Sequence, residues 1–346
     1  MSSSTRSSLP DPERTVTPRR SVVFMFPGQG AQHVQMAAGL YGHYQPFTEM
    51  MDRAFSFFER HGRFLRREWL ASTPSAQFDD VSVAQPLLYA VNCALGTQAI
   101  ELGIRPDVLM GHSVGELSAA TFGGVFDFET GLQIIDELID RCSGVPAGGM
   151  ISVACSADRI ESHLTEQVTI GAINAPRQLL LAGPDAALEA VRERLIREDI
   201  TCKRTPARQP FHSPAMLSAP VGERAWATKL REPARTVLSC YTGKELDKAT
   251  ATDPDFWSSQ PALPVLFGPT LDALLAERSC LLIQTGPGQN LTALARRLPT
   301  VRSGTSAAVP MLPAGVQPDS AADREAITAL LRHPALVSQP DVGTPR

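Results

Sequence analysis

A serine between two glycines is the first feature of this sequence with the composition of a reactive site. The stretch MGHSVGEL, residues 110–117, contains the pattern Gly-x-Ser-x-Gly with Ser113 at its centre. Such glycines let the backbone turn sharply enough to project a hydroxyl group from the end of a sheet. A short apolar run, PDVLMGH, leads up to Ser113, and a helix-compatible run of small residues follows it. This context favours a nucleophile, and the alternative is a serine that caps the following helix.

A serine hydroxyl is a poor nucleophile until a base accepts its proton, and histidine is the usual base near neutral pH. The chain has seven histidines. The strongest candidate is His212, in the stretch RQPFHSPAM, because the chain there leaves a predicted insert and rejoins the main sheet, at the expected edge of a cleft. His112 adjoins the serine, and we expect its side chain to point to the other side of the turn.

A glycine-rich stretch, FPGQG at residues 26–30, follows the apolar run SVVFMF. Its glycines free the backbone, and Gln29 is placed either to fix the loop or to donate to a substrate oxygen. Taken alone, the stretch is equally compatible with a tight turn. It lacks both the G-x-G-x-x-G pattern of dinucleotide-binding folds and the lysine of a P-loop.

The composition excludes several classes of function. With 346 residues, of which 43% are hydrophobic, the chain can bury a large core. A net charge of −4 gives no electrostatic reason to expect nucleic acid or an anionic membrane as a partner. The six cysteines are scattered without metal-ligand spacing, and no apolar run approaches membrane-spanning length. We therefore expect a cytoplasmic protein with reduced thiols and no bound metal or cofactor.

The elements that would position these residues alternate between strands and helices. Short apolar strands followed by helical patterns predict an α/β fold with a parallel sheet covered on both faces. Residues 149–212 differ, since they read strand, helix, strand, strand, helix, strand, the order of a ferredoxin-like unit. The expected divisions are a disordered tail at 1–20, a large subdomain in two parts at 21–148 and 213–300, the ferredoxin-like insert at 149–212, and a loosely ordered tail at 301–346.

Six stretches of this chain together resemble one known family. They are FMFPGQGAQ, AQPLLYAVNCALG, GHSVGELSAA, INAPR, FHSPAM and IQTGPGQNLTALAR. They occur in the order and approximate spacing of malonyl-CoA:acyl-carrier-protein transacylases and the acyltransferase domains of polyketide synthases, over about residues 21–300. The resemblance implies an α/β-hydrolase-like large domain with a ferredoxin-like insert, in agreement with the pattern of elements.

The resemblance also implies a role for each matching position. Ser113 matches the acylated nucleophile, and His212 matches the base that activates it. Gln29 matches the glutamine at the oxyanion hole, where the backbone N–H of Val114 is the second donor. Gln260 falls where the family has a residue whose backbone carbonyl orients the histidine. The implied reaction is ping-pong, because a thioester first acylates the serine and a second thiol then removes the acyl group.

The sequence departs from the family at the position that selects the acyl group. Family members that use malonyl units hold the free carboxylate of the malonyl group with an arginine. This chain has Leu138 at the position of that arginine. A carboxylate buried without a partner costs several kcal/mol, so we expect an acyl group that is not a dicarboxylate. Arg141 is the alternative clamp, although it is displaced along the helix by about 4.5 Å. Other expected substrate contacts are Gln85, His112 and Phe211, the last of which resembles malonyl-type sequences.

The leading hypothesis is a free-standing acyltransferase of polyketide-type biosynthesis. It would move an acyl group from a coenzyme A or carrier-protein thioester to the phosphopantetheine thiol of an acyl carrier protein. The alternatives are an editing acyl-thioester hydrolase, an ordinary malonyl transacylase that uses Arg141, and an inactive docking partner. Carrier proteins are acidic, so exposed basic side chains are expected at their docking surface. The candidates are Arg204, Arg208, Arg296 and Arg297.

Overall fold

The computed structural model describes residues 19–218, 221–317 and 319–337, and it contains two sheets. The larger sheet has the strand order β10-β9-β1-β2-β7-β8, in which the first five strands run parallel and β8 pairs antiparallel to β7. These strands are β1 (Ser21–Phe26), β2 (Val108–Gly111), β7 (Thr236–Ser239), β8 (Lys244–Glu245), β9 (Cys280–Gln284) and β10 (Ala307–Pro310). The parallel sheet predicted from the alternating pattern is thus confirmed.

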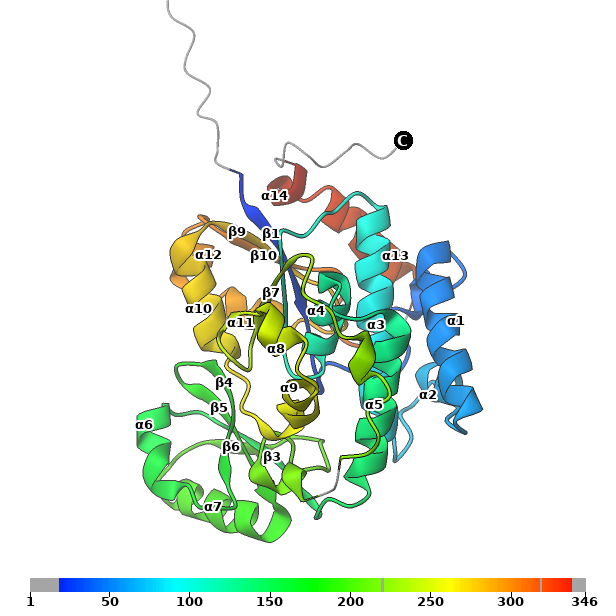
Figure 1. Cartoon of the computed structure of the whole chain (residues 1–346). Coiled ribbons are helices and arrows are strands. Elements are labelled where there is room, and N and C mark those ends of the chain that lie inside the picture. The colour runs from blue at the N-terminus through cyan, green and yellow to red at the C-terminus, as the bar shows by residue number, and fades with distance from the viewer. Residues whose placement is uncertain (1–18, 219–220, 318, 338–346) are drawn as a thin grey trace, which may run out of the picture.

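Helices cover this sheet on both sides (Figure 1). The larger helices of this part are α1 (Gln45–Arg60), α3 (Val81–Glu101), α4 (Gly115–Gly123), α5 (Phe128–Cys142), α10 (Phe267–Glu277) and α13 (Ala321–Leu331). The shorter ones are α2 (Leu65–Trp69), α8 (Lys248–Ala251), α9 (Pro254–Ser259), α11 (Asn290–Ala295), α12 (Pro299–Arg302) and α14 (Pro334–Val337). None of the helices in the described ranges is long and apolar enough to cross a membrane.

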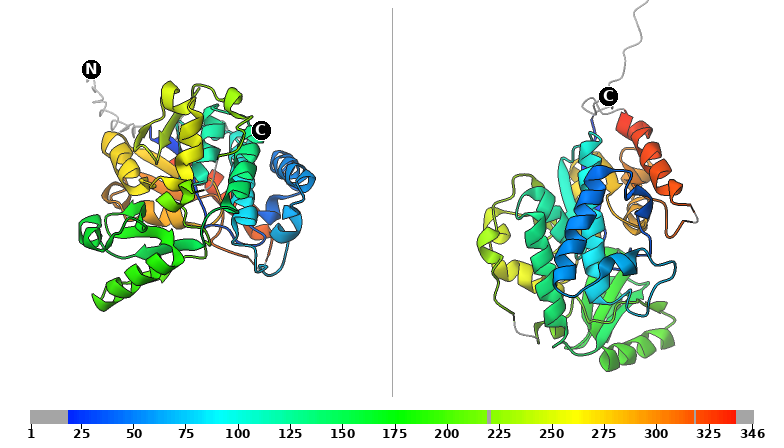
Figure 2. Two further views of the ribbon diagram at one scale, coloured as in Figure 1. Left: turned by 60° about the horizontal axis from the view of Figure 1, so that its bottom comes forward. Right: turned by 90° about the vertical axis from the view of Figure 1, so that its right-hand side faces the viewer.

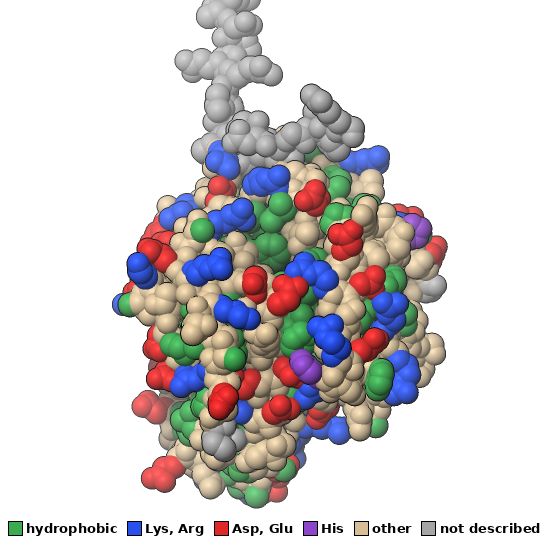
Figure 3. Space-filling view, turned by 45° about the vertical axis from the view of Figure 1, so that its right-hand side comes forward, with side chains coloured by type: hydrophobic (Ala, Val, Ile, Leu, Met, Phe, Trp, Pro, Cys, Tyr) green, Lys and Arg blue, Asp and Glu red, His purple; other side chains and the backbone are tan. Residues whose placement is uncertain are grey.

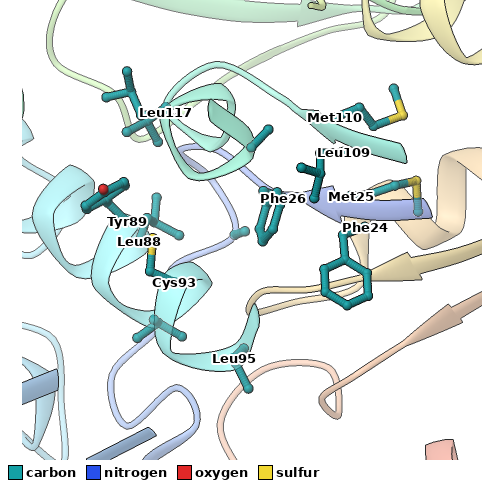
Figure 4. Close-up of a cluster of buried hydrophobic side chains, with 14 of the residues drawn as sticks. Phe24, Met25, Phe26, Leu88, Tyr89, Cys93, Leu95, Leu109, Met110 and Leu117 are labelled. Atoms are coloured by element: carbon teal, nitrogen blue, oxygen red, sulfur yellow. The ribbon is translucent and has the colours of Figure 1, made fainter. Parts of the chain in front are cut away.

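The core of the large subdomain lies between the central strands and the helices α3 and α4. Phe24, Met25 and Phe26 of β1 are fully buried, because a central parallel strand is covered on both faces. Figure 4 shows these side chains together with Leu88 of α3 and Leu109 of β2. Burial on both faces explains the continuous apolar run of residues 21–26 in the sequence.

The smaller sheet is antiparallel and has the order β4-β5-β3-β6. Its strands are β3 (Gly148–Val153), β4 (Thr169–Ala175), β5 (Gln178–Pro184) and β6 (Cys202–Arg204), and its helices are α6 (Ala157–Ile160) and α7 (Asp185–Arg197). In chain order the strands lie 2-3-1-4, which is the arrangement of a ferredoxin-like unit. This subdomain has its own apolar core, and the left view of Figure 2 shows it beside the large one.

The C-terminal segment differs from the expected loose tail after residue 300. β10 pairs with β9 as the edge of the large sheet, and α13 packs against the segment around Gly39. There the Asp323 carboxylate accepts from the N–H of Gly39 at 2.9 Å, and Arg324 donates to the Gly39 carbonyl at 2.9 Å. In the right view of Figure 2, α13 is the red helix at the upper right. The tail prediction was wrong for these elements, because their apolar residues complete the core only in three dimensions. Residues 1–18 of the expected N-terminal tail lie outside the described part.

Acidic and basic side chains alternate over the face drawn in Figure 3, without a large patch of one sign. This pattern agrees with the small net charge of −4.

Candidate active site

Ser113 lies in a tight turn between the end of β2 and the start of α4. Its φ angle is 55°, in the left-handed region that few residues other than glycine adopt. A Cβ on Gly111 would overlap the backbone of Gly115, and a Cβ on Gly115 would overlap the carbonyl oxygen of Phe26. Close backbone contacts therefore require both glycines of the motif. The turn places the serine at the N-terminus of α4, the positive end of the helix dipole.

His212 comes from far downstream and meets this serine. Its Nε2 lies 2.8 Å from the Oγ of Ser113. Its Nδ1 lies 2.9 Å from the backbone carbonyl oxygen of Leu263. Because a carbonyl oxygen can only accept, Nδ1 carries the ring proton and Nε2 is free to accept the serine proton. The pair thus has the tautomer that a general base requires.

The carbonyl that accepts the hydrogen bond from His212 Nδ1 lies three residues after the position expected from the sequence. The backbone carbonyl of Gln260 was predicted to hold His212, but the hydrogen bond goes to Leu263, three residues later. The carbonyl of Gln260 instead accepts from the N–H of Leu263 at 3.1 Å, which closes a short turn. The Gln260 side chain is buried, and its Nε2 lies 3.5 Å from the carboxyl group of Glu116.

The Leu263 carbonyl is held in place by the insert. The N–H of Val265 donates to the carbonyl of Gly171 at 2.9 Å, and its carbonyl accepts from the N–H of Ile173 at 2.8 Å. The chain between α9 and α10 therefore pairs with β4. A long-range backbone pairing of this kind leaves no local signal, which is why the sequence did not point to the carbonyl of Leu263.

Burial controls the protonation of the histidine. Burial, together with a smaller contribution from the nearby His112, lowers the pKa of His212 from 6.5 to about 4. The backbone carbonyls of Leu263 and Gln260 act in the opposite direction. His212 is therefore neutral at physiological pH and ready to accept a proton.

The FPGQG loop packs directly against the serine. A Cβ on Gly28 would lie 3.0 Å from the Cβ of Ser113 and would overlap the carbonyl oxygen of His112. The side chain of Gln29 fixes the loop, because its Nε2 donates to the carbonyl of Asp79 at 2.9 Å. The backbone N–H groups of Gln29 and Val114 have no acceptor among the described residues. Two free donors thus border the serine hydroxyl, as an oxyanion hole requires.

A largely apolar pocket opens beside the dyad. It brings together most of the predicted site residues, namely Ser113, Val114, His212, Gln85, Leu138, Phe211, Arg141 and Gln260. Gln85 is buried, and its Nε2 lies 3.4 Å from the Oε1 of Gln29. The pocket therefore joins the predicted nucleophile to the predicted specificity positions.

Leu138 and Arg141 both line this pocket, but they differ in what they offer a ligand. Leu138 is 9% exposed and presents only apolar atoms. Arg141 directs its Nη1 to the backbone carbonyl of Ser258 at 2.8 Å. Its Nε is buried and has no partner among the described residues. Nη1 is thus occupied by the protein, whereas the edge formed by Nε and Nη2 has no hydrogen-bond partner among the described residues.

His112 turns away from the pocket, as the sequence suggested. Its Nε2 lies 2.7 Å from the Oδ1 of Asn174, in the INAPR stretch of β4. Burial lowers the pKa of His112, and the contact with Asn174 opposes this effect. His112 therefore joins the serine turn to the insert, and it does not line the pocket as the predicted substrate contact would.

The four arginines proposed for carrier-protein contact bond to four different partners within the protein. Arg204 forms an ion pair with Asp185, and Arg208 donates to the carbonyl of Ala76 at 2.8 Å. Arg296 donates to the carbonyl of Ala308 at 3.2 Å. Arg297 donates to Gln178 of β5 at 3.2 Å. Of the four, only Arg297 lines the groove between the insert and the large subdomain, where Arg177 lies as well.

Aromatic side chains that the sequence analysis missed complete the pocket. Tyr241, Trp226 and Trp257 all line it. Burial raises the pKa of Tyr241 well above its usual value, and an interaction with the side chain of Ser113 opposes this shift. Tyr241 follows β7, and the carboxyl ends of parallel strands meet at one edge of the sheet, so its place after a strand was an available signal. In the described ranges no group of side chains has the composition of a metal site.

Comparison with known proteins identifies one family. The family model described as "Acyl transferase domain" matches residues 23–326. A component of the phenolphthiocerol/phthiocerol polyketide synthase of Mycobacterium tuberculosis is 35% identical over 281 residues, which are 80% of this chain and 19% of that protein. Mycoketide-CoA synthase of the same species is 29% identical over 299 residues, 85% of this chain and 7% of that protein. The chain therefore spans about a fifth or less of these relatives.

Solved structures agree in fold. The acyltransferase domain from the second module of the salinomycin polyketide synthase has a TM-score of 0.79 and 27% identity, covering 94% of this chain and 75% of that one. Malonyl CoA-acyl carrier protein transacylase from Burkholderia pseudomallei has a TM-score of 0.70 and 27% identity, covering 81% of this chain and 99% of that one. The chain belongs to the acyl transferase domain family, and the relatives named here are polyketide synthases and a transacylase.

Proposed function

We propose that this protein moves an acyl group that is not a dicarboxylate from a thioester to Ser113, and from there to the phosphopantetheine thiol of an acyl carrier protein. The donor thioester is carried by coenzyme A or by another carrier protein. The observation that carries this proposal is the 2.8 Å contact between Ser113 and His212, inside a pocket that Leu138 lines.

The first half-reaction follows from the geometry of the dyad. His212 Nε2 accepts the hydroxyl proton as Ser113 Oγ attacks the thioester carbonyl carbon. The N–H groups of Gln29 and Val114 then stabilise the negative charge on the former carbonyl oxygen. Collapse of this intermediate breaks the carbon–sulfur bond, and the imidazolium returns the proton to the departing thiolate. The products are an acyl-serine and a free thiol.

The second half-reaction runs the same steps in reverse order. His212 accepts a proton from the pantetheine thiol, and the thiolate sulfur attacks the acyl-serine carbonyl carbon. The serine oxygen leaves and recovers its proton from the imidazolium. Because Nδ1 stays hydrogen-bonded to Leu263, the ring holds one orientation through both halves. No carboxylate forms an ion pair with His212 among the described residues, so the dyad would work with a backbone carbonyl in that place.

The apolar wall supports the exclusion of dicarboxylates. A malonyl carboxylate beside Leu138 would lose its hydration without gaining a charged partner at that position, and Arg141 lies about 4.5 Å further along the helix with its Nη1 bonded to Ser258. An uncharged acyl group does not meet this desolvation penalty.

The acceptor's docking site is proposed at the groove between the two subdomains. Arg177 and Arg297 line this groove and would face an acidic carrier protein. The other three predicted arginines bond to Asp185 or to backbone carbonyls elsewhere.

The test separates transfer from hydrolysis and from inactivity. The protein is incubated with a panel of acyl-CoA thioesters, and its intact mass is measured with and without a holo acyl carrier protein. Transfer predicts an acyl adduct on the protein that moves to the carrier. Rapid release of free acid without the carrier would support an editing hydrolase instead. No adduct with any thioester, and the same result for Ser113→Ala, would contradict the proposal.

A further inference from the structure

A second hollow adjoins the pocket that holds Ser113, and the two share a wall. Glu137, Arg141 and Trp226 line both of them. Glu137 and Arg141 lie four residues apart on α5, so they face the same side of that helix. Asp140 and Glu223 lie further out in the second hollow. An acyl chain longer than the inner pocket would therefore leave it past Glu137.

The charges of this outer hollow are mostly negative, and two of them are not neutralised. Asp136 and Asp140 form ion pairs with Arg63. Glu137 and Glu223 form no ion pair among the described residues. Glu137 Oε2 accepts a hydrogen bond from the indole Nε1 of Trp226 at 2.6 Å, and this neutral donor leaves the charge in place. A ligand cation would supply the missing partner.

Arg141 does not neutralise the charge of Glu137 through an ion pair. Its Nη1 donates to the backbone of Ser258, and it forms no ion pair with Glu137. Its buried Nε lacks an acceptor among the described residues. An unpaired N–H donor beside a carboxylate that has no ion-pair partner among the described residues suits a group that carries both an ammonium and a neutral oxygen acceptor. A second carboxylate at this position would meet the charge of Glu137.

We propose that Glu137 selects acyl groups that carry a protonated amine, whose ammonium pairs with its carboxylate while an amide or hydroxyl oxygen accepts from Arg141. This inference rests on the proposed function, since it concerns the acyl group that Ser113 receives. It names the substrate class as amino-bearing acyl thioesters. Leu138, which precedes the exit, then serves as an apolar contact for the chain between the thioester and the amine.

The experiment compares two thioesters of equal shape. The 3-aminobutyryl and 3-methylbutyryl thioesters of coenzyme A differ by an ammonium in place of a methyl group. The kcat/KM for acylation of Ser113 is measured for both by intact-mass kinetics. The wild-type protein should prefer the amine by about tenfold or more, as charge-assisted pairing predicts. Glu137→Gln should lose this preference, so that the ratio of the two kcat/KM values falls to about one, while glutamine can still accept the hydrogen bond from Trp226.

Glu223→Gln is the matched control, since it removes a charge from the same hollow without touching the proposed contact. It should leave the ratio of the two rates within about twofold. A loss equal to that of Glu137→Gln would overturn the pairing with Glu137.

Failure of this inference is distinct from failure of the proposed function. If the wild-type protein accepts both thioesters equally, or favours malonyl, the amine preference is refuted while acyl transfer stands. This outcome needs no variant, so it holds even if Glu137→Gln misfolds. If no thioester acylates Ser113, acyl transfer itself is refuted.

Discussion

Ser113 and His212 meet at 2.8 Å, and both have left-handed backbone conformations, with φ angles of 55° and 64°. Neither is a glycine, so each conformation is held by its surroundings at a cost of about 1–2 kcal/mol. At Ser113 the crowding of β1 against α4 imposes it, and at His212 the contacts with β4 and the Leu263 segment do so. Strain at the two ends of one proton-transfer contact fits a site built for function at some expense of stability.

This strain predicts an unusual effect on stability. Ser113→Gly should be more stable than Ser113→Ala by about 1 kcal/mol, because glycine adopts a positive φ without the steric penalty. Both variants lack the hydroxyl, so both should fail to form an acyl adduct. Urea denaturation of the two proteins measures the difference. Equal midpoints would show that the turn at residue 113 is not strained.

Burial of the histidine predicts the pH dependence of acylation. The base must be unprotonated, and burial lowers the pKa of His212 to about 4 from 6.5. The rate of Ser113 acylation should therefore stay nearly constant as the pH falls from 7 to about 5, and decline only below that. Intact-mass measurement of the quenched acylation reaction across this pH range tests the prediction. Circular dichroism at each pH confirms that the protein is folded. A decline centred at pH 6.5 would mean an exposed imidazole.

His212→Ala is the companion variant for this measurement. It should slow acylation by about 10²- to 10⁴-fold, the usual worth of a general base. The acylation rate that remains in this variant should not show the decline at low pH that is expected for the wild-type protein.

Leu138 offers a gain-of-function test of specificity. Leu138→Arg places a guanidinium in the pocket wall and should raise kcat/KM for malonyl-CoA by about tenfold or more. Leu138→Met keeps the wall apolar and should leave malonyl use unchanged. Arg141→Gln completes the set: if it abolishes existing malonyl use in the wild-type protein, then Arg141 is the clamp and the exclusion of dicarboxylates is wrong.

A buried carboxyl group beneath the site predicts how stability varies with pH. Burial raises the pKa of Glu116 to about 8, against hydrogen bonds from Ser239 and Cys240. The folded state thus keeps a proton that the unfolded chain releases above about pH 4.5, so wild-type stability falls as the pH rises through that window. Glu116→Gln removes this titration.

The measurement for Glu116 is the free energy of unfolding of both proteins at several pH values. The difference should grow in favour of Glu116→Gln by roughly 1.4 kcal/mol per pH unit between about 4.5 and 8, then level off. The exposed Glu193→Gln is the control and should show no such trend. A difference that does not change with pH would refute the raised pKa.

The sequence predicted the elements whose signals are local. The strand ending at Phe26, the turn at Ser113 and the order of strands in the insert all follow from patterns within a few residues, and the structure has each of them. It failed where partners are distant. The pairing of β10 with β9 and the contact of α13 with Gly39 join segments that are far apart in the sequence, so no local pattern predicts them.

The same distinction holds within the site. By itself the sequence determined which groups are candidates for the chemistry, since Ser113, His212 and the FPGQG loop are recognisable from residue types and spacing. Only the tertiary structure decided that the Leu263 carbonyl accepts from Nδ1 of the imidazole and that Arg141 donates to Ser258. The same holds for Glu137, which accepts from Trp226 and has no ion-pair partner among the described residues. The physical reason is that a hydrogen bond or an ion pair depends on which atoms the fold brings within about 3 Å, and that distance is set by packing between segments far apart in the chain.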